Sequence, residues 1–79
     1  MIKEITIDPK ICHGKPCIKG TRIPVEIILE LIANGYTIEK IIKDCYPILT
    51  KKQVKAALQY SVSVIKNEKV YPLSATRTS

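Results

Sequence analysis

The chain has 79 residues, 46% of them hydrophobic, and carries a net charge of +6. This length accommodates one small domain, and no apolar run approaches the ~20 residues needed to span a bilayer. Three cysteines are too few, and odd in number, for the disulfide framework of a secreted protein, and no signal peptide is evident. We therefore expect a soluble, cytoplasmic protein. A short chain so rich in aliphatic side chains has little core of its own, which favours a homodimer or larger oligomer.

The charge is unevenly distributed along the chain. Residues 1–23 carry five basic and two acidic side chains, residues 24–44 carry two basic and four acidic, and residues 45–79 carry six basic and one acidic. A basic domain with an acidic middle suggests that one surface meets a polyanion.

Residues 2–7 end with apolar Ile5 and Ile7 alternating with Glu4 and Thr6, which predicts a short strand with one buried face that ends at Asp8-Pro9. An isolated strand is unstable in water. We expect it to pair either with residues 17–23 or with a second copy of the chain.

Residues 12–24 contain Cys12, His13 and Cys17 in a stretch punctuated by glycine and proline, which predicts a loop. Structural zinc normally takes four ligands, often from two paired elements, and the sequence offers no second pair. The remaining cysteine, Cys45, falls at an apolar position of a predicted helix. We therefore expect structural cysteines, no metal site and no cofactor.

Three helices follow. Residues 25–34 form the first, which begins after Pro24 and ends at Gly35, and it is apolar around most of its circumference. Thr37 caps a second helix that runs to about Cys45, and the third helix covers residues 51–67. We expect one domain over residues 1–67. Residues 68–79 lack periodicity and form a tail that is either disordered or ordered by a partner.

The third helix has the most informative pattern. Thr50 is a good N-cap, and Gln53 stands three residues later, where it completes a capping box. Apolar or small residues recur at helical spacing and predict one buried face: Val54, Ala57, Leu58, Ser61, Val62 and Ile65. The opposite face carries Lys52, Lys55, Ala56, Gln59, Ser63 and Lys66.

No acidic residue lies between Asp44 and Glu68, so this face suits a polyanion. The alternative is an ordinary solvated face, although such helices usually mix charges at i,i+4. A second helix followed by a tight turn and this third helix has the outline of a helix-turn-helix.

The sequence argues against an enzyme. The single histidine, His13, has only neighbouring cysteines as partners, and neither a serine-elbow motif nor a glycine-rich phosphate loop occurs. The acidic residues are scattered along the chain. We predict no catalytic residues.

The stretch Gly14-Lys-Pro-Cys-Ile-Lys-Gly-Thr-Arg-Ile-Pro-Val25 resembles the bacterial and archaeal family known as domain of unknown function 433. The likeness continues through residues 31–37, 46–50 and 54–58. It implies a mainly α fold, a three-helix homeodomain-like helix-turn-helix preceded by short β-strands. It also implies a small dimeric, VapB-like antitoxin that binds its own promoter and neutralises a PIN-like ribonuclease toxin.

Within this resemblance, Gly20 permits a tight turn and Thr21 satisfies backbone groups ahead of the first helix. Arg22 either bridges to a carboxylate such as Glu26 or to helix C-terminal carbonyls, or contacts phosphate or a minor groove.

We expect a DNA-binding antitoxin-type repressor. The residues predicted to contact double-stranded DNA are Thr50, Lys51, Lys52, Gln53, Lys55, Ala56, Gln59 and Arg22. The alternative is a protein-interaction module that binds a partner through the first helix and the tail, without significant DNA binding.

Overall fold

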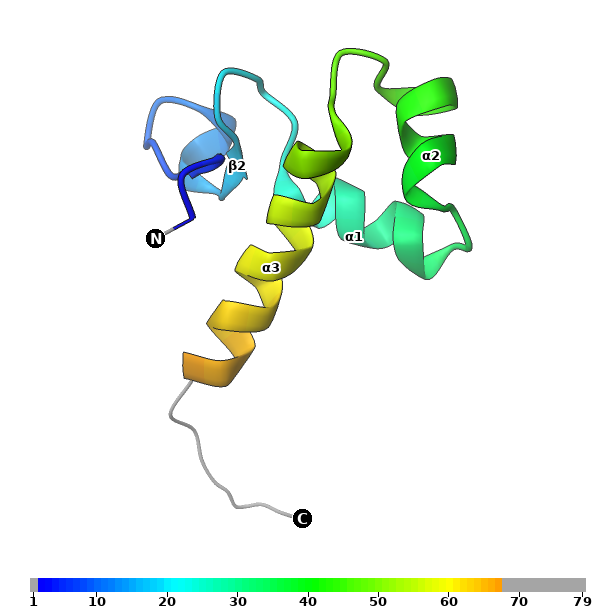
Figure 1. The fold of residues 1–79 in the computed structure, drawn as a ribbon. Coiled ribbons are helices and arrows are strands. Elements are labelled where there is room, and N and C mark those ends of the chain that lie inside the picture. The colour runs from blue at the N-terminus through cyan, green and yellow to red at the C-terminus, as the bar shows by residue number, and fades with distance from the viewer. Residues whose placement is uncertain (1, 68–79) are drawn as a thin grey trace.

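The structure, a computed structural model, describes residues 2–67 and is mainly helical (Figure 1). Two short strands, β1 (Ile5–Thr6) and β2 (Cys17–Ile18), flank a single turn of 3-10 helix, η1 (Cys12–Gly14). Three helical segments follow: α1 (Val25–Ala33), α2 (Ile38–Lys40) with its continuation η2 (Ile41–Cys45), and α3 (Lys51–Asn67). The expected tail, residues 68–79, lies outside the described residues. No helix within residues 2–67 is long and apolar enough to cross a membrane.

The N-terminal strand finds its partner within the same chain. Strand β1 pairs antiparallel with β2, and Ile5 stands opposite Ile18. Of the two residues expected to face the core, Ile5 is buried whereas Ile7 is 46% exposed. The strand ends at Thr6, because Asp8 turns the chain by accepting hydrogen bonds from two backbone N–H groups further along. Ile7 therefore lies beyond the ladder.

The helix boundaries follow from local signals. Gly35 has φ +97°, and the N–H of Tyr36 donates to the carbonyl of Leu31 at 3.0 Å. This is the Schellman arrangement that ends α1. Thr37 caps α2, since its Oγ1 accepts from the backbone N–H of Lys40 at 3.1 Å. The predicted starts and ends of these helices are confirmed.

The second helix is less regular than expected. After Lys40 it widens into a π-helical turn, in which the N–H of Tyr46 donates to the carbonyl of Ile41 at 2.8 Å. Pro47 disfavours helical dihedrals at Tyr46, so the helix ends there and the chain turns towards α3.

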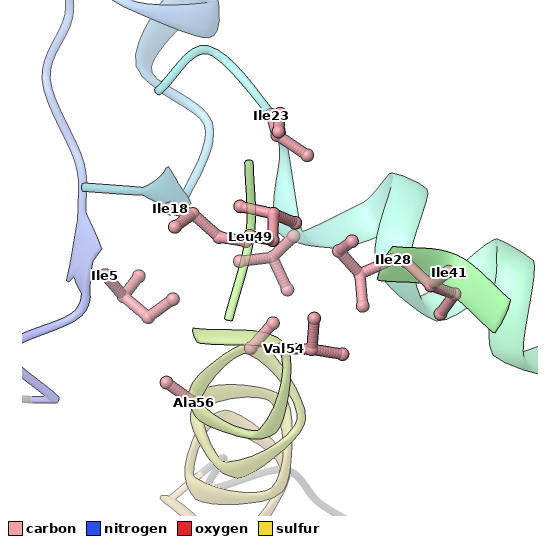
Figure 2. Close-up of a cluster of buried hydrophobic side chains, with 10 residues drawn as sticks. Ile5, Ile18, Ile23, Ile28, Ile41, Leu49, Val54 and Ala56 are labelled. Atoms are coloured by element: carbon pink, nitrogen blue, oxygen red, sulfur yellow. The ribbon is translucent and has the colours of Figure 1, made fainter. Parts of the chain in front are cut away.

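The core lies where the strand pair, α1 and α3 converge (Figure 2). Burial of each large aliphatic side chain contributes about 1.5–3 kcal/mol. Among residues 2–67, no polar or charged side chain is buried. The core residues are Ile5, Ile18, Ile23, Val25, Ile28, Ile41, Leu49, Val54, Ala56 and Ala57.

Candidate nucleic-acid interface

Helix α3 begins with the predicted capping box. Thr50 Oγ1 accepts from the backbone N–H of Gln53 at 3.2 Å, and Gln53 Oε1 accepts from the backbone N–H of Thr50 at 2.8 Å. The cap stabilises the first turn, typically by about 1 kcal/mol. It also gives both side chains a local role at the helix start. Direct DNA contact by Thr50 and Gln53 stays a prediction.

One side of α3 is open to solvent. At 100° per residue, four polar side chains fall within an arc of about 100°. Each of them is exposed. From Lys51 to Asn67 the helix contains no carboxylate, so this side presents positive charge without an acidic neighbour on its own helix. We call these four residues the basic face of α3: Lys51, Lys52, Lys55 and Gln59.

Ala56 does not belong to the basic face, and the prediction that it lies on the open side is wrong. Its side chain is only 2% exposed and is part of the core. The helical wheel assumed that one side of the helix is buried. In the structure α3 contacts α1 and also both strands, so two sides are covered. Figure 2 shows Ala56 on the strand side, towards Ile5.

The second half of α3 departs from the predicted pattern too. Val62 and Ile65, expected in the buried face, are 51% and 72% exposed. Ser63, expected on the open face, is half-buried and its hydroxyl donates to the carbonyl of Tyr60 at 2.7 Å. The buried core ends near the middle of α3, and the later turns are covered only in part, on the side that faces the start of α1.

Two carboxylates from other elements approach the basic face. Lys51 Nζ lies 3.5 Å from Glu39 Oε2 of α2, and Lys52 Nζ lies 3.6 Å from Glu4 Oε2, next to β1. A hydrogen bond from its own backbone N–H and the charge of Lys51 lower the pKa of Glu39. Exposed pairs of this kind contribute little to stability. Both lysine side chains remain mostly exposed.

The strands bring further lysines to the start of α3. Lys3, Glu4, Lys19 and Gln53 line one shallow hollow of about 300 Å³. The backbone N–H of Lys19 donates to the carbonyl of Glu4 at 2.8 Å, which holds the two strands at this point. The sequence alone does not predict the position of Lys3 and Lys19, because nothing local indicates that residues before β1 and after β2 lie beside α3.

The loop that follows β2 is built around Gly20 and Thr21. Gly20 has φ +84°, a conformation that other residues adopt only with strain. Thr21 Oγ1 donates to the carbonyl of Ile18 at 2.7 Å and accepts from the backbone N–H of Ile23 at 3.1 Å. The expected tight turn and the expected role of Thr21 are both confirmed.

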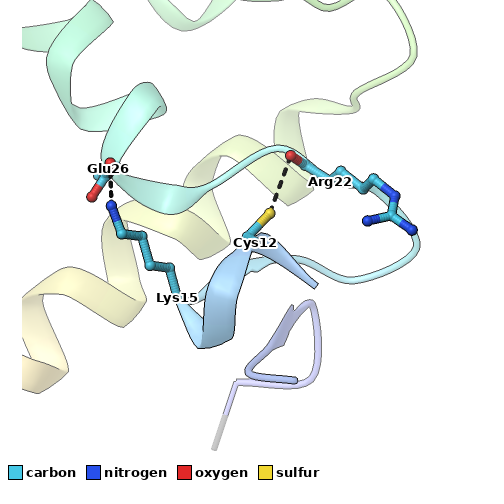
Figure 3. Close-up of polar contacts among 4 residues, drawn as sticks. All are labelled: Cys12, Lys15, Arg22 and Glu26. Atoms are coloured by element: carbon cyan, nitrogen blue, oxygen red, sulfur yellow. Dashed lines mark hydrogen bonds and ion pairs between the residues drawn. The ribbon is translucent and has the colours of Figure 1, made fainter. Parts of the chain in front are cut away.

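Arg22 does not bridge to Glu26. That carboxylate pairs with Lys15 instead, at 3.2 Å between Lys15 Nζ and Glu26 Oε2. Figure 3 shows the guanidinium of Arg22 pointing away from this pair, and within residues 2–67 it forms no ion pair. Its backbone carbonyl accepts from Cys12 Sγ at 3.3 Å. The side chain is exposed, so a phosphate contact stays a prediction.

Comparison with known sequences identifies the family. The sequence model described as "Protein of unknown function (DUF433)" matches residues 5–61. This chain belongs to the DUF433 family. The match covers both strands, α1, α2 and the basic face of α3, and it ends within α3.

Two relatives extend this result. The DUF433 chain is 30% identical over 57 residues to the uncharacterized protein y4eO of Sinorhizobium fredii (strain NBRC 101917 / NGR234), a match that covers 72% of this chain and 25% of that protein. It also resembles the crystal structure of a DUF433 member protein from Anabaena variabilis, with a TM-score of 0.73 and 30% identity over 80% of this chain and 61% of that one. The chain therefore spans a quarter of the length of the Sinorhizobium protein and less than two thirds of the length of the Anabaena protein.

Two of the three cysteines of this DUF433 chain, Cys12 and Cys17, contact the loop that follows β2. Cys17 is fully buried, and burial raises the pKa of its thiol. Its Sγ lies 3.7 Å from the carbonyl of Thr21, while Cys12 Sγ reaches the carbonyl of Arg22. Across residues 2–67, no three His, Cys, Asp or Glu side chains gather as metal ligands would. These contacts connect η1 and β2 to the loop that follows β2.

Cys12 and His13 both adopt left-handed backbone dihedrals, with φ +53° and +56°. Two consecutive non-glycine residues in this region carry strain of order 1–3 kcal/mol each. The turn they form directs Lys15 towards Glu26.

Proposed function

We propose that this DUF433 protein is a DNA-binding repressor of the antitoxin type, with a homeodomain-like helix-turn-helix. The observation that carries the proposal is the exposed basic face of α3, which lies on a helix without any carboxylate. Helix α3 follows α2 through a short connection, residues 46–50, as the recognition helix follows the first helix of a helix-turn-helix. The N-terminal half of α3 enters the major groove.

Each part of the surface has a distinct role in this proposal. Lys51, Lys52 and Lys55 contact phosphates or guanine edges, and Gln59 reaches bases. The positive end of the α3 dipole adds to the attraction for phosphate. Arg22, with an exposed guanidinium, contacts the backbone beside the groove.

The test is a fluorescence-anisotropy titration with the upstream DNA of the protein's own gene and a scrambled duplex. We expect preference for the upstream DNA. Three lysine–phosphate contacts per protomer, doubled in a dimer, should lower the affinity roughly 10³-fold between 50 and 200 mM salt. Absence of binding even at low salt would mean that the basic face is only solvated.

The antitoxin part of the proposal rests on the family resemblance. It predicts that the protein inhibits a PIN-like ribonuclease, which a ribonuclease from a neighbouring gene would test directly. Inhibition that saturates at a fixed molar ratio supports neutralisation. A ribonuclease whose activity does not change in the presence of excess protein contradicts it.

A protein-interaction module is the second candidate function. Four apolar side chains of α1 remain only partly buried, although they are large. They are Ile27, Leu29, Leu31 and Ile32. A module of this kind would bind a protein partner and show no useful DNA affinity, so the anisotropy titration separates the two functions.

A further inference from the structure

Two thiols of the chain contact the same short stretch of backbone. Cys12 Sγ, from η1, donates to the carbonyl of Arg22 at 3.3 Å. Cys17 Sγ, from β2, donates to the carbonyl of the preceding residue, Thr21, at 3.7 Å. Figure 3 shows the sulfur of Cys12 directed at the Arg22 carbonyl. The two sulfur atoms therefore meet the loop after β2 at consecutive residues.

The chain between the two cysteines turns back on itself. The N–H of Lys15 donates to the carbonyl of Cys12 at 3.0 Å, and Gly14 has φ +80° within this turn. Strand β2 begins two residues later, at Cys17. Burial, and next the neighbouring thiol of Cys12, raise the pKa of the Cys17 thiol. The two sulfur atoms are thus neighbours, which a disulfide requires.

The two thiols differ in their access to solvent. Cys17 is fully buried, whereas Cys12 is half-buried. Oxidation of a cysteine depends on the exposure of its sulfur, and a second cysteine beside it can resolve the product. Cys12 is therefore placed to meet an oxidant and Cys17 to act as the resolving cysteine. The third cysteine, Cys45, lies at the end of η2.

We propose that Cys12 and Cys17 form a disulfide when the protein meets a peroxide. The Cys12 sulfur attacks one oxygen of hydrogen peroxide, the O–O bond breaks, and the leaving hydroxide takes the thiol proton to form water. The Cys17 sulfur then attacks the resulting sulfenic acid. An S–S bond replaces the S–O bond, and a second water leaves with the Cys17 proton. Together the two thiols lose two electrons and two protons, which reduce one peroxide to two water molecules.

The disulfide changes the loop that carries Arg22. A disulfide sulfur has no hydrogen to donate, so the carbonyls of Thr21 and Arg22 both lose their thiol donors. The hydrogen bond from the Thr21 hydroxyl to the Ile18 carbonyl remains, but fewer contacts hold the loop. Oxidation therefore loosens the backbone at Arg22. The oxidised protein then binds DNA more weakly, a step that rests on the proposed function.

Peptide mapping of the full chain after treatment with equimolar hydrogen peroxide tests the disulfide. Trypsin does not cleave before Pro16, so Cys12 and Cys17 stay on one peptide, residues 11–19. Cys45 falls on a different peptide. We expect the peptide 11–19 to lose two hydrogen atoms and to resist alkylation until a reductant is added, while Cys45 remains a free thiol.

Two serine variants provide the matched comparison. Cys12→Ser keeps a hydroxyl that can donate to the Arg22 carbonyl but cannot form the disulfide, and circular dichroism verifies that it folds. Cys45→Ser removes the thiol outside the pair. We expect peroxide to leave Cys17 free in Cys12→Ser, and to produce the disulfide in Cys45→Ser as in wild type.

Amide hydrogen exchange tests the effect on the loop. The N–H of Thr21 and the N–H of Ile23 both donate within this turn. We expect both to exchange several-fold faster in the oxidised wild type than in the reduced protein. Peroxide should not change their exchange in Cys12→Ser.

Three results would overturn the inference: free thiols on the peptide 11–19 after peroxide, a disulfide that joins two chains or includes Cys45, or unchanged exchange in the loop. DNA titrations of both forms separate it from the proposed function. A protein that forms the disulfide but binds no DNA in either form contradicts only the proposed function, and equal DNA affinity of the two forms contradicts the Arg22 contact. DNA binding without a disulfide contradicts only this inference.

Discussion

Lys52 Nζ on α3 lies 3.6 Å from Glu4 Oε2 beside the first strand. This ion pair joins the start of the candidate DNA-binding helix to the N-terminal strand pair. The Lys52 side chain is 74% exposed, whereas that of Glu4 is 19% exposed. The Glu4 side chain is thus largely covered, whereas the Lys52 side chain is open to solvent. Glu4 sets the electrostatic environment in which Lys52 would meet a phosphate.

Neutralising that carboxylate should strengthen DNA binding. Glu4→Gln keeps the shape of the side chain and removes a negative charge next to Lys52, and Glu39→Gln does the same for Lys51. We expect each variant to bind DNA several-fold more tightly at low salt, and the gain should diminish at high salt because screening weakens the repulsion. Anisotropy titrations measure this change. Equal affinities for wild type and both variants would show that DNA does not approach this end of α3.

Removal of two lysines from the basic face should weaken binding to every sequence. Lys52→Ala combined with Lys55→Ala removes two phosphate contacts per protomer, so the slope of log affinity against log salt should become shallower by about 1.8 per protomer. The control is Lys10→Ala with Lys15→Ala, which removes the same charge from the loop between the strands. Unchanged binding by the α3 double variant would rule out the proposed placement in the groove.

Ala56→Lys distinguishes the structure from the helical-wheel prediction. If Ala56 lay on the open face, a lysine there would be tolerated and would improve DNA binding. Because it is 2% exposed and packs in the core, we expect a loss of about 2 kcal/mol or more in the free energy of unfolding. Urea denaturation gives this value. Gln59→Lys, at an exposed position of the same helix, should leave stability nearly unchanged.

The hydroxyl of Thr21 should matter more than its methyl group. Thr21→Val removes a donor to the Ile18 carbonyl and an acceptor for the Ile23 N–H, and leaves partly buried backbone groups unpaired. We expect a destabilisation of about 2 kcal/mol. Thr21→Ser keeps the hydroxyl and should retain most of the stability. Similar unfolding free energies for the valine and serine variants would contradict this role.

His13→Gly should stabilise the protein. His13 has φ +56° and ψ +33°, and glycine adopts this conformation without the steric cost of a Cβ atom. We expect a gain of about 0.5–1 kcal/mol, measured by urea denaturation. Lys15→Gly is the counterpart, because Lys15 has φ −78° and ψ +151°, which suits any residue. That variant should be destabilised, and a gain of stability there would show that the left-handed backbone is not the cause.

The sequence by itself determined where the helices begin and end. The Thr50–Gln53 box, the Thr37 cap and the glycine at the end of α1 act over four or five residues, so reading neighbouring positions was sufficient. The turn at Gly20 and Thr21 is local in the same sense. The resemblance of residues 14–25 to DUF433 identified the family for a similar reason, because a contiguous motif carries it.

Only the tertiary structure decided which faces of those helices are covered. Ala56 is buried because β1 and β2, from the other end of the chain, pack against α3. Ile65 is exposed because no described element packs over its side chain. Arg22 is exposed, and the carboxylate of Glu26 pairs with Lys15 instead. Each outcome depends on residues that are distant in sequence and meet only after the chain folds, so no periodicity within one helix could have predicted it.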